Sequence, residues 1–181
     1  MSIFFTSDPH YGHTNIIKYC NRPFADAAEM NEQLIANWNG TVGRNDIVYV
    51  LGDMFFVEVE KARAIMHRLN GMKRIVLGNH DKLIRREPTL QALFDKILPD
   101  LHEESINGTR IIMCHYPLLT WNKSNHGSIQ LHGHQHNSNP ISRPDRRCYD
   151  VGVDANGYMP VKLENIIARL SKIEPARGRE D

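Results

Sequence analysis

Five short polar motifs in this chain contain side chains that can bind metal ions or transfer protons. In chain order the motifs are Asp8-Pro9-His10, Gly52-Asp53, Gly78-Asn79-His80-Asp81, His115 and Gly133-His134-Gln135-His136. Most of them directly follow an apolar run, and a buried strand that ends in a loop places its next side chains at one edge of a sheet. Carboxylate, amide and imidazole groups suit Mn, Fe, Zn or Ni, and two such ions held close together form a hydrolytic centre. The motifs together therefore predict one dinuclear metal site.

Two of these motifs contain a pair of candidate ligands separated by one residue. Asp8 and His10 form the first pair, and His134 and His136 form the second. Because alternate residues of an extended segment point to the same side, each pair is expected to face an ion from one side. A single polar residue at a strand end, such as Asp53, is more often a helix cap than a ligand, so the prediction rests on the whole set.

The motif Gly78-Asn79-His80-Asp81 combines a candidate ligand with a candidate proton donor. The side-chain oxygen of Asn79 can bind a metal ion, and His80 beside it can donate a proton. Asp81 can orient that imidazole through a hydrogen bond. Asn79 would fit a helix cap or a turn equally well if no metal were bound.

Length, composition and charge describe an ordinary globular chain. The 181 residues fit one compact domain with room for a hydrophobic core. The 41% hydrophobic and 24% charged residues exclude a disordered composition. The formal net charge of +1 argues against a dedicated nucleic-acid-binding protein, whereas a nucleotide still fits as a partner. The sequence carries no signal of oligomeric state.

The N-terminus and the cysteines predict a cytoplasmic protein without a membrane segment. Residues 1–6 have neither a basic leader nor a long apolar stretch, so no signal peptide is expected. No apolar run approaches the roughly 20 residues needed to cross a bilayer. Cys20, Cys114 and Cys148 are widely spaced, which is typical of reduced thiols.

Strand-like and helix-like segments alternate along the chain, which favours an α/β fold. Strands are expected at residues 3–7, 47–51, 74–77, 103–106, 109–114, 129–132 and 148–153. Asn107-Gly108 between two of these strands predicts a tight hairpin.

Three helices are expected between the strands. The first follows a capping box at residues 26–29 and buries Met30, Leu34 and Trp38. The second covers residues 58–69, and the third opens at Pro160. We expect one domain over residues 1–172, with a polar loop at residues 137–147, followed by a charged, frayed tail at residues 173–181.

In this order and with these spacings, the five motifs resemble those of the calcineurin-like metallophosphoesterases. The resemblance covers residues 3–170, and every ligand position of the family is filled. The segments 6–17 and 21–24 are similar to a small bacterial and phage-type branch of this family. The resemblance implies a four-layer α/β fold, namely a β-sandwich of two mixed sheets flanked by helices, with the metal site at the strand ends.

The resemblance also implies a role for each candidate residue. Asp8, His10 and His136 would bind the first metal ion. Asn79, His115 and His134 would bind the second, and Asp53 would bridge the two. The implied cofactors are two divalent ions, with Mn favoured and Fe, Zn or Ni also fitting the ligand set.

The implied reaction is in-line attack on phosphorus by a hydroxide that bridges the two ions. His80 would stabilise the transition state or protonate the leaving oxygen, and Asp81 would raise its basicity. Arg22 would either bind a substrate phosphate through two hydrogen bonds or form a surface salt bridge.

The function expected from the sequence is therefore that of a metal-dependent phosphoesterase. The favoured substrate is a phosphodiester within a small organic phosphate or nucleotide, because the short chain has no added domain that would recruit a protein substrate. One alternative is a nuclease that uses the same centre, which the near-neutral charge argues against. The other is a non-catalytic interaction scaffold, which would be expected to have lost ligands or His80.

Overall fold

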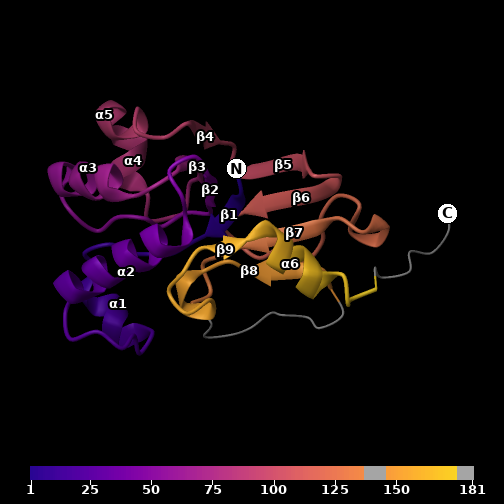
Figure 1. Ribbon diagram of the computed structural model, residues 1–181, viewed down its shortest axis with the longest axis horizontal. Helices are drawn as coiled ribbons and strands as arrows, with labels where there is room; N and C mark the ends of the chain where they lie inside the picture. The colour runs from indigo at the N-terminus through magenta and orange to yellow at the C-terminus, as the bar shows by residue number, and fades with distance from the viewer. Residues whose placement is uncertain (137–145, 175–181) are drawn as a thin grey trace.

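The computed structural model describes residues 1–136 and 146–174 of the chain, and its strands form two sheets (Figure 1). The first sheet has the order β4-β3-β2-β1-β9. Its strands are β1 (Ile3–Thr6), β2 (Ile47–Val50), β3 (Met72–Val76), β4 (Lys96–Leu98) and β9 (Val161–Lys162). β1 to β4 are parallel and β9 is antiparallel to β1, so the sheet is mixed.

The second sheet has the order β5-β6-β7-β8 and is also mixed. Its strands are β5 (Leu101–Ile106), β6 (Thr109–Cys114), β7 (Ile129–His132) and β8 (Cys148–Asp150). β5 and β6 form the predicted antiparallel hairpin, whereas β6, β7 and β8 are parallel. Asn107 and Gly108 both have positive φ, at 50° and 78°, as a tight hairpin turn of matching twist requires.

Helices flank the sheets on two sides. They are α1 (Thr14–Tyr19), α2 (Ala27–Thr41), α3 (Val59–Arg68), α4 (Lys82–Arg86), α5 (Pro88–Gln91) and α6 (Leu163–Leu170). α1 to α5 lie beyond the first sheet on the side away from the second, and α6 lies beside β8 and β9 (Figure 1). Two short 3₁₀ turns, η1 (Ser124–His126) and η2 (Val153–Ala155), complete the described elements. No helix in these residues is long and apolar enough to cross a membrane.

Alternate residues of the central strands fill two separate hydrophobic cores. In β2, Val48 and Val50 face the core shared with α2 and α3, while Tyr49 faces the core between the two sheets. Met30, Leu34 and Trp38 of α2 are all buried in the first core, as their helical spacing predicts. Each such side chain contributes about 1.5–3 kcal/mol when it is fully buried.

The predicted fold class of two mixed sheets with flanking helices is confirmed, but several elements differ from the prediction. The structure adds three helices, α1, α4 and α5, and two strands, β4 and β9, in segments where the sequence predicts none. Pro160 does not open the last helix; it precedes the two-residue edge strand β9, and the helix begins at Leu163. The strand expected at residues 148–153 ends at Asp150, after which the chain forms η2. Of the expected polar loop and tail, residues 137–145 and 175–181 lie outside the described residues.

Parallel strands place three of the five polar motifs at one edge of the first sheet, and the other two follow β6 and β7 of the second sheet. β1, β2 and β3 are neighbours in register, so the residues that follow them meet beyond their carboxyl ends. Gly52, which follows β2, has a φ of 100° and lies against the loop after β3. A Cβ at this position would lie 2.6 Å from the backbone nitrogen of Gly78 and 2.6 Å from Nδ1 of His115. The close approach of these two loops therefore depends on the missing side chain.

Replacing Gly52 with alanine is expected to lower the free energy of unfolding by about 3 kcal/mol or more, through backbone strain and overpacking together. Urea unfolding followed by circular dichroism measures this change. Gly40→Ala is the matched control, because no atom lies within 4 Å of the corresponding Cβ in α2. That variant should be about 0.5–1 kcal/mol more stable than wild type, since alanine favours a helix. Equal stability of the two variants would contradict the role given to Gly52.

Candidate metal centre

One group of candidate ligands consists of Asp8, His10 and His136, which we call the first ligand group. Oδ1 of Asp8 lies 3.7 Å from Nε2 of His10 and 3.9 Å from Nε2 of His136. All three atoms converge on one small volume, and one ligand atom from each residue lies within 4.8 Å of the others. Atoms at such separations can be bound to one ion at the usual distances of about 2.0–2.2 Å.

The second ligand group consists of Asn79, His115 and His134. Nε2 of His115 lies 3.0 Å from Oδ1 of Asn79 and 3.2 Å from Nδ1 of His134. Nδ1 of His115 lies 2.7 Å from the carbonyl oxygen of Leu51. A carbonyl can only accept, so Nδ1 carries the proton of the neutral ring and Nε2 is left to bind a metal ion.

Asp53 lies between the two ligand groups. Its Oδ2 is 3.7 Å from Nε2 of His10 and 3.4 Å from Nε2 of His115. Its Oδ1 accepts a hydrogen bond of 2.8 Å from the backbone N–H of His80. One oxygen of Asp53 is thus fixed by the loop after β3, and the other faces both groups.

Two buried polar atoms in the first ligand group have no hydrogen-bond partner among the described residues. They are Oδ1 of Asp8 and Nε2 of His10. Leaving a buried donor or acceptor unpaired costs about 1–3 kcal/mol, and more for a charged group. A bound cation would satisfy both atoms, so the residues fit a divalent metal ion.

The backbone at the candidate ligands is left-handed, which corrects the expectation of extended pairs. Asp8 and His10 have φ values of 58° and 52°, and His134 and His136 have 70° and 49°. Asp53 has a φ of 56°, so these five make up more than half of the nine non-glycine residues with positive φ in residues 1–136 and 146–174. Asp8 and His10 do come together, through turns rather than through alternation in a strand, whereas His134 and His136 belong to different ligand groups. Strained backbone of this kind is concentrated at functional sites.

The loops hold these conformations through hydrogen bonds between segments that are distant in sequence. The N–H of Asp8 donates to the carbonyl of Gly52 at 3.0 Å, and the N–H of His10 donates to that of Asp53 at 3.2 Å. The N–H of His134 donates to Oδ2 of Asp8 at 2.8 Å. The second sheet is therefore tied directly to the loop that follows β1.

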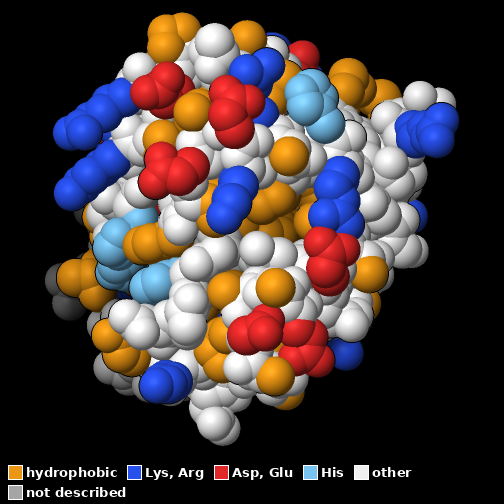
Figure 2. Space-filling view, turned by 90° about the vertical axis from the view of Figure 1, so that its left-hand side faces the viewer, with side chains coloured by type: hydrophobic (Ala, Val, Ile, Leu, Met, Phe, Trp, Pro, Cys, Tyr) orange, Lys and Arg blue, Asp and Glu red, His pale blue; other side chains and the backbone are white. Residues whose placement is uncertain are grey.

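Burial divides the site into a closed side and an open side. Asp8, His10 and Asp53 are buried, whereas His80 and His134 are exposed. The space-filling view shows histidine side chains grouped with hydrophobic side chains at the left margin of the helical face (Figure 2). A substrate can therefore reach the ligand groups from the side of His80 and His134.

The carboxylates divide the histidines into those that hold a proton and those that do not. Burial lowers the pKa of His115, but the Asp53 carboxylate 3.4 Å away and the charge of Asp8 together raise it to about 9. Burial would raise the pKa of Asp8, yet the imidazoles around it hold that pKa well below its usual value. Burial lowers the pKa of His10 and of His134. In the metal-free protein, His115 is therefore protonated at neutral pH.

Arg22 was expected either to bind a substrate phosphate or to form a surface salt bridge, and the structure shows a salt bridge that is buried. Its side chain has no exposed surface, and its Nε and Nη2 donate to the two oxygens of Asp154, each at 2.8 Å. Nη2 and Nη1 also donate to the carbonyls of Asp8 and Pro9 at 2.8 Å and 2.9 Å. A buried guanidinium with these partners cannot meet a phosphate at the surface.

Asp81 holds the loops together instead of orienting His80. Its oxygens accept from the N–H groups of Asp53, Met54 and Gly78 at 2.7, 2.9 and 2.8 Å. The carboxylate is buried, and among the described contacts it has no hydrogen bond to the His80 imidazole.

Three residues at the site belong to none of the predicted roles. Nδ1 of His13 lies 3.3 Å from Nδ1 of His10, and its ring stacks on Phe56 at 4.0 Å. Asp154 lies 2.8 Å from Nδ1 of His136. His13 has no recognisable ligand spacing, so the sequence gives no signal for it. Asp154 follows strand β8 as the other motifs follow their strands, and this position could have identified it as a candidate.

Comparison with known proteins identifies relatives that match nearly the whole chain. The chain is 35% identical to an uncharacterized protein of Methanocaldococcus jannaschii, over 99% of this chain and 97% of the relative. It is 29% identical to the Gene 66 protein of Mycobacterium phage L5, over 96% of each chain. The crystal structure of a protein of unknown function from Aquifex aeolicus superposes with a TM-score of 0.74 at 27% identity, over 93% of this chain and 98% of that chain.

A family model was also matched. The model of the calcineurin-like phosphoesterases covers residues 1–155, which include every candidate ligand and all but one strand of the first sheet. The chain therefore belongs to the calcineurin-like phosphoesterase family.

Proposed function

We propose that this chain is a phosphodiesterase with a dinuclear metal centre that acts on a small organic phosphate or a nucleotide. The observation that carries the proposal is the position of Asp53. A single oxygen of this carboxylate faces Nε2 of His10 at 3.7 Å and Nε2 of His115 at 3.4 Å. An oxygen in this place can be shared by two ions, one in each ligand group.

Two divalent ions would supply an activated water and neutralise the charge that develops on the phosphate. The chain fixes the positions of the ligands and buries one side of the site. Asp8, His10 and Asp53 are buried there, so their charges and dipoles act in a medium of low dielectric. Mn²⁺ is the proposed ion, since a mixed set of carboxylate, amide and imidazole ligands suits it.

His80 is proposed as the proton donor to the leaving oxygen. Its backbone N–H is bonded to Oδ1 of Asp53, which fixes the start of the side chain beside the shared carboxylate. Its ring is exposed and lies 5.9 Å from the ring of His10, measured between centroids. The imidazole thus borders both the ligand groups and solvent, where a leaving group would depart.

The open side of the site supports a small substrate. Asn79, His80 and His134 are exposed, so a small phosphate ester can reach them from solvent. The formal net charge of +1 gives little long-range attraction for a nucleic-acid backbone, so a nuclease is the less favoured reading. A non-catalytic scaffold would have no need for the unpaired buried atoms of Asp8 and His10.

The cytoplasm is the proposed location. Cys20 and Cys114 are free thiols, and Cys114 is buried. Free thiols persist where glutathione and thioredoxin keep proteins reduced.

Activity is expected to require metal, Asp53 and His80. Metal-stripped protein should hydrolyse an aryl phosphodiester only after Mn²⁺ is added back, and faster than the matching monoester. Asp53→Asn should lower turnover at least about 100-fold and weaken Mn²⁺ binding, because it removes the shared charge. His80→Ala should lower kcat by about 10²–10⁴-fold and leave Mn²⁺ binding unchanged.

His67→Ala is the matched control for these variants, since His67 is an exposed histidine in α3. Turnover and metal binding should equal those of wild type. Stoichiometric Mn²⁺ binding without turnover on either ester would favour the scaffold. Preferential cleavage of oligonucleotides over the aryl diester would favour the nuclease.

Metal binding is expected to strengthen as the pH rises. His115 holds a proton in the metal-free protein up to a pKa of about 9, and an imidazole must be neutral to bind a metal ion. One proton must therefore leave for each ion bound in the second ligand group, so the affinity should rise about tenfold per pH unit from pH 7 toward pH 9. Titration calorimetry in buffers of different ionisation enthalpy counts this proton. An affinity that stays constant between pH 7 and pH 8.5 would contradict the protonation of His115.

A further inference from the structure

We propose that Arg22 and Asp154 form a positioning pair that holds the two halves of the first ligand group in place. The inference rests on the proposed function, in which this group binds a metal ion. One half is the loop carrying Asp8 and His10, and the other is His136. Neither member of the pair belongs to the five polar motifs, and they lie 132 positions apart in the chain.

Asp154 fixes the orientation and the tautomer of His136. Oδ2 of Asp154 lies 2.8 Å from Nδ1 of His136. The carboxylate can only accept a hydrogen bond, so Nδ1 carries the ring proton. In the neutral ring, which is the form that binds a metal ion, Nε2 then carries no proton and faces Oδ1 of Asp8 at 3.9 Å. A carboxylate in this relation to an imidazole is the usual partner of a metal-binding histidine.

Arg22 holds the other half of the first ligand group. Its guanidinium donates to the carbonyls of Asp8 and Pro9 at 2.8 Å and 2.9 Å. Both carbonyls belong to the segment whose Asp8 and His10 have positive φ. These two hydrogen bonds stabilise a left-handed backbone that a non-glycine residue rarely adopts.

A single buried ion pair connects the two halves. The side chains of Arg22 and Asp154 are 0% and 4% exposed, and they form two parallel hydrogen bonds of 2.8 Å. Such a fork fixes geometry in a way that a single bond to a lysine would not. Because burying an ion pair brings little net stability, placement of the ligands is the better reason for this pair.

The first test reads the tautomer of His136 in the metal-free protein, at a pH high enough for the ring to be neutral. Two-bond ¹H–¹⁵N spectra distinguish a proton on Nδ1 from one on Nε2, and a His136→Gln variant assigns the signal. Wild type should show the proton on Nδ1, and Asp154→Ala should lose that preference. Asp154→Asn retains an acceptor oxygen and should keep it. An unchanged tautomer in Asp154→Ala would overturn the proposal.

The second test measures Mn²⁺ binding to metal-stripped protein by calorimetry. Asp154→Ala should weaken one of two binding events by about 10–100-fold and leave the other within about threefold of wild type. Asp154→Asn should lose less Mn²⁺ affinity than Asp154→Ala. If Asp154→Ala does not fold because Arg22 is left unpaired, the double variant Arg22→Met with Asp154→Ala removes both charges and takes its place. Wild-type affinity in the variant used would overturn the proposal.

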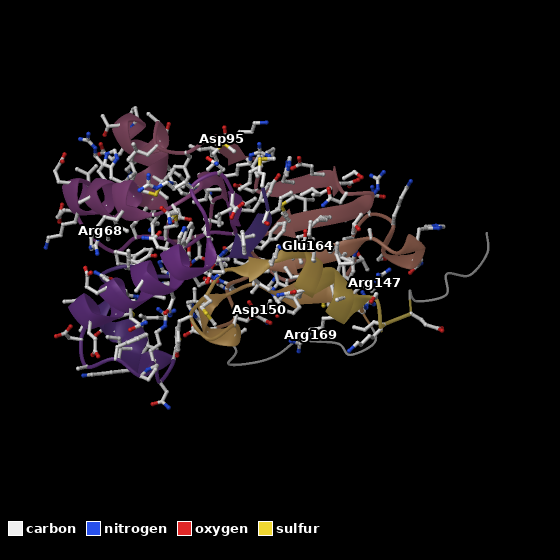
Figure 3. All side chains as sticks on the ribbon, viewed as in Figure 1. Arg68, Asp95, Arg147, Asp150, Glu164 and Arg169 are labelled. Carbon is white, nitrogen blue, oxygen red and sulfur yellow. The ribbon has the colours of Figure 1, made fainter. Side chains whose placement is uncertain are left out.

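Asp95→Ala is the matched control, because it also breaks an arginine–aspartate pair. Nε of Arg74 donates to Oδ2 of Asp95 at 2.7 Å, in a more exposed place. Asp95 lies beside β4, well away from Asp150 at the end of β8 (Figure 3). Its variant should bind Mn²⁺ as wild type does, and an equal loss in both variants would overturn the positioning role. Absence of Mn²⁺ binding in wild type would instead overturn the proposed function, and this measurement is made first.

Discussion

Three hydrogen bonds to the buried carboxylate of Asp81 hold the centre of the site together. They come from the backbone of two loops, one after β2 and one after β3. Asp53 and His80 lie in these loops and are bonded to each other as well, so each loop fixes the conformation of the other. In a network of this kind every bond depends on its neighbours, and loss of one member disturbs the rest. Asp53 and Asn79, which are candidate ligands, lie in these two loops, so their positions depend on the same hydrogen bonds.

The same junction holds two buried charges and a strained backbone in place. Asp8 and Asp53 are both buried, and each has a pKa held below its usual value, by neighbouring imidazoles above all. Asp8, His10 and Asp53 also have left-handed backbone conformations. Strain and unpaired polar atoms persist only where the surrounding structure over-determines them. Here the surroundings are the parallel strands β1 and β2, whose loops are bonded to one another.

Much of this arrangement could be predicted from the sequence, for physical reasons. The five polar motifs, together with the family resemblance, predict the seven side chains that the structure brings together, because the strands that precede them in both sheets end beside the same site. The capping box at Asp26 and the Asn107-Gly108 turn identified local structure, because both depend on bonds within a few residues.

Features that depend on distant contacts could not be predicted in this way. The burial of Arg22 follows from a partner 132 positions away, and a surface role and a buried role look alike in sequence. The left-handed backbone at Asp8 is likewise held by contacts with Gly52 and Arg22, not by its own residue type alone. Asp81 was assigned to His80 because the two are adjacent, whereas its actual partners lie across the loop junction.

The unequal burial of the two ligand groups has a consequence for how metal ions enter and leave. Asp8 and His10 are 0% and 2% exposed, whereas Asn79 and His134 are exposed. An ion in the second group would keep access to water and exchange quickly with the surrounding pool, and an ion in the first group would exchange slowly. The protein would then retain its inner ion through changes in supply while its outer ion follows them. One molecule could then hold two different metals. The metal in the first group would be the one bound earlier, and the metal in the second group would be the one available at the time.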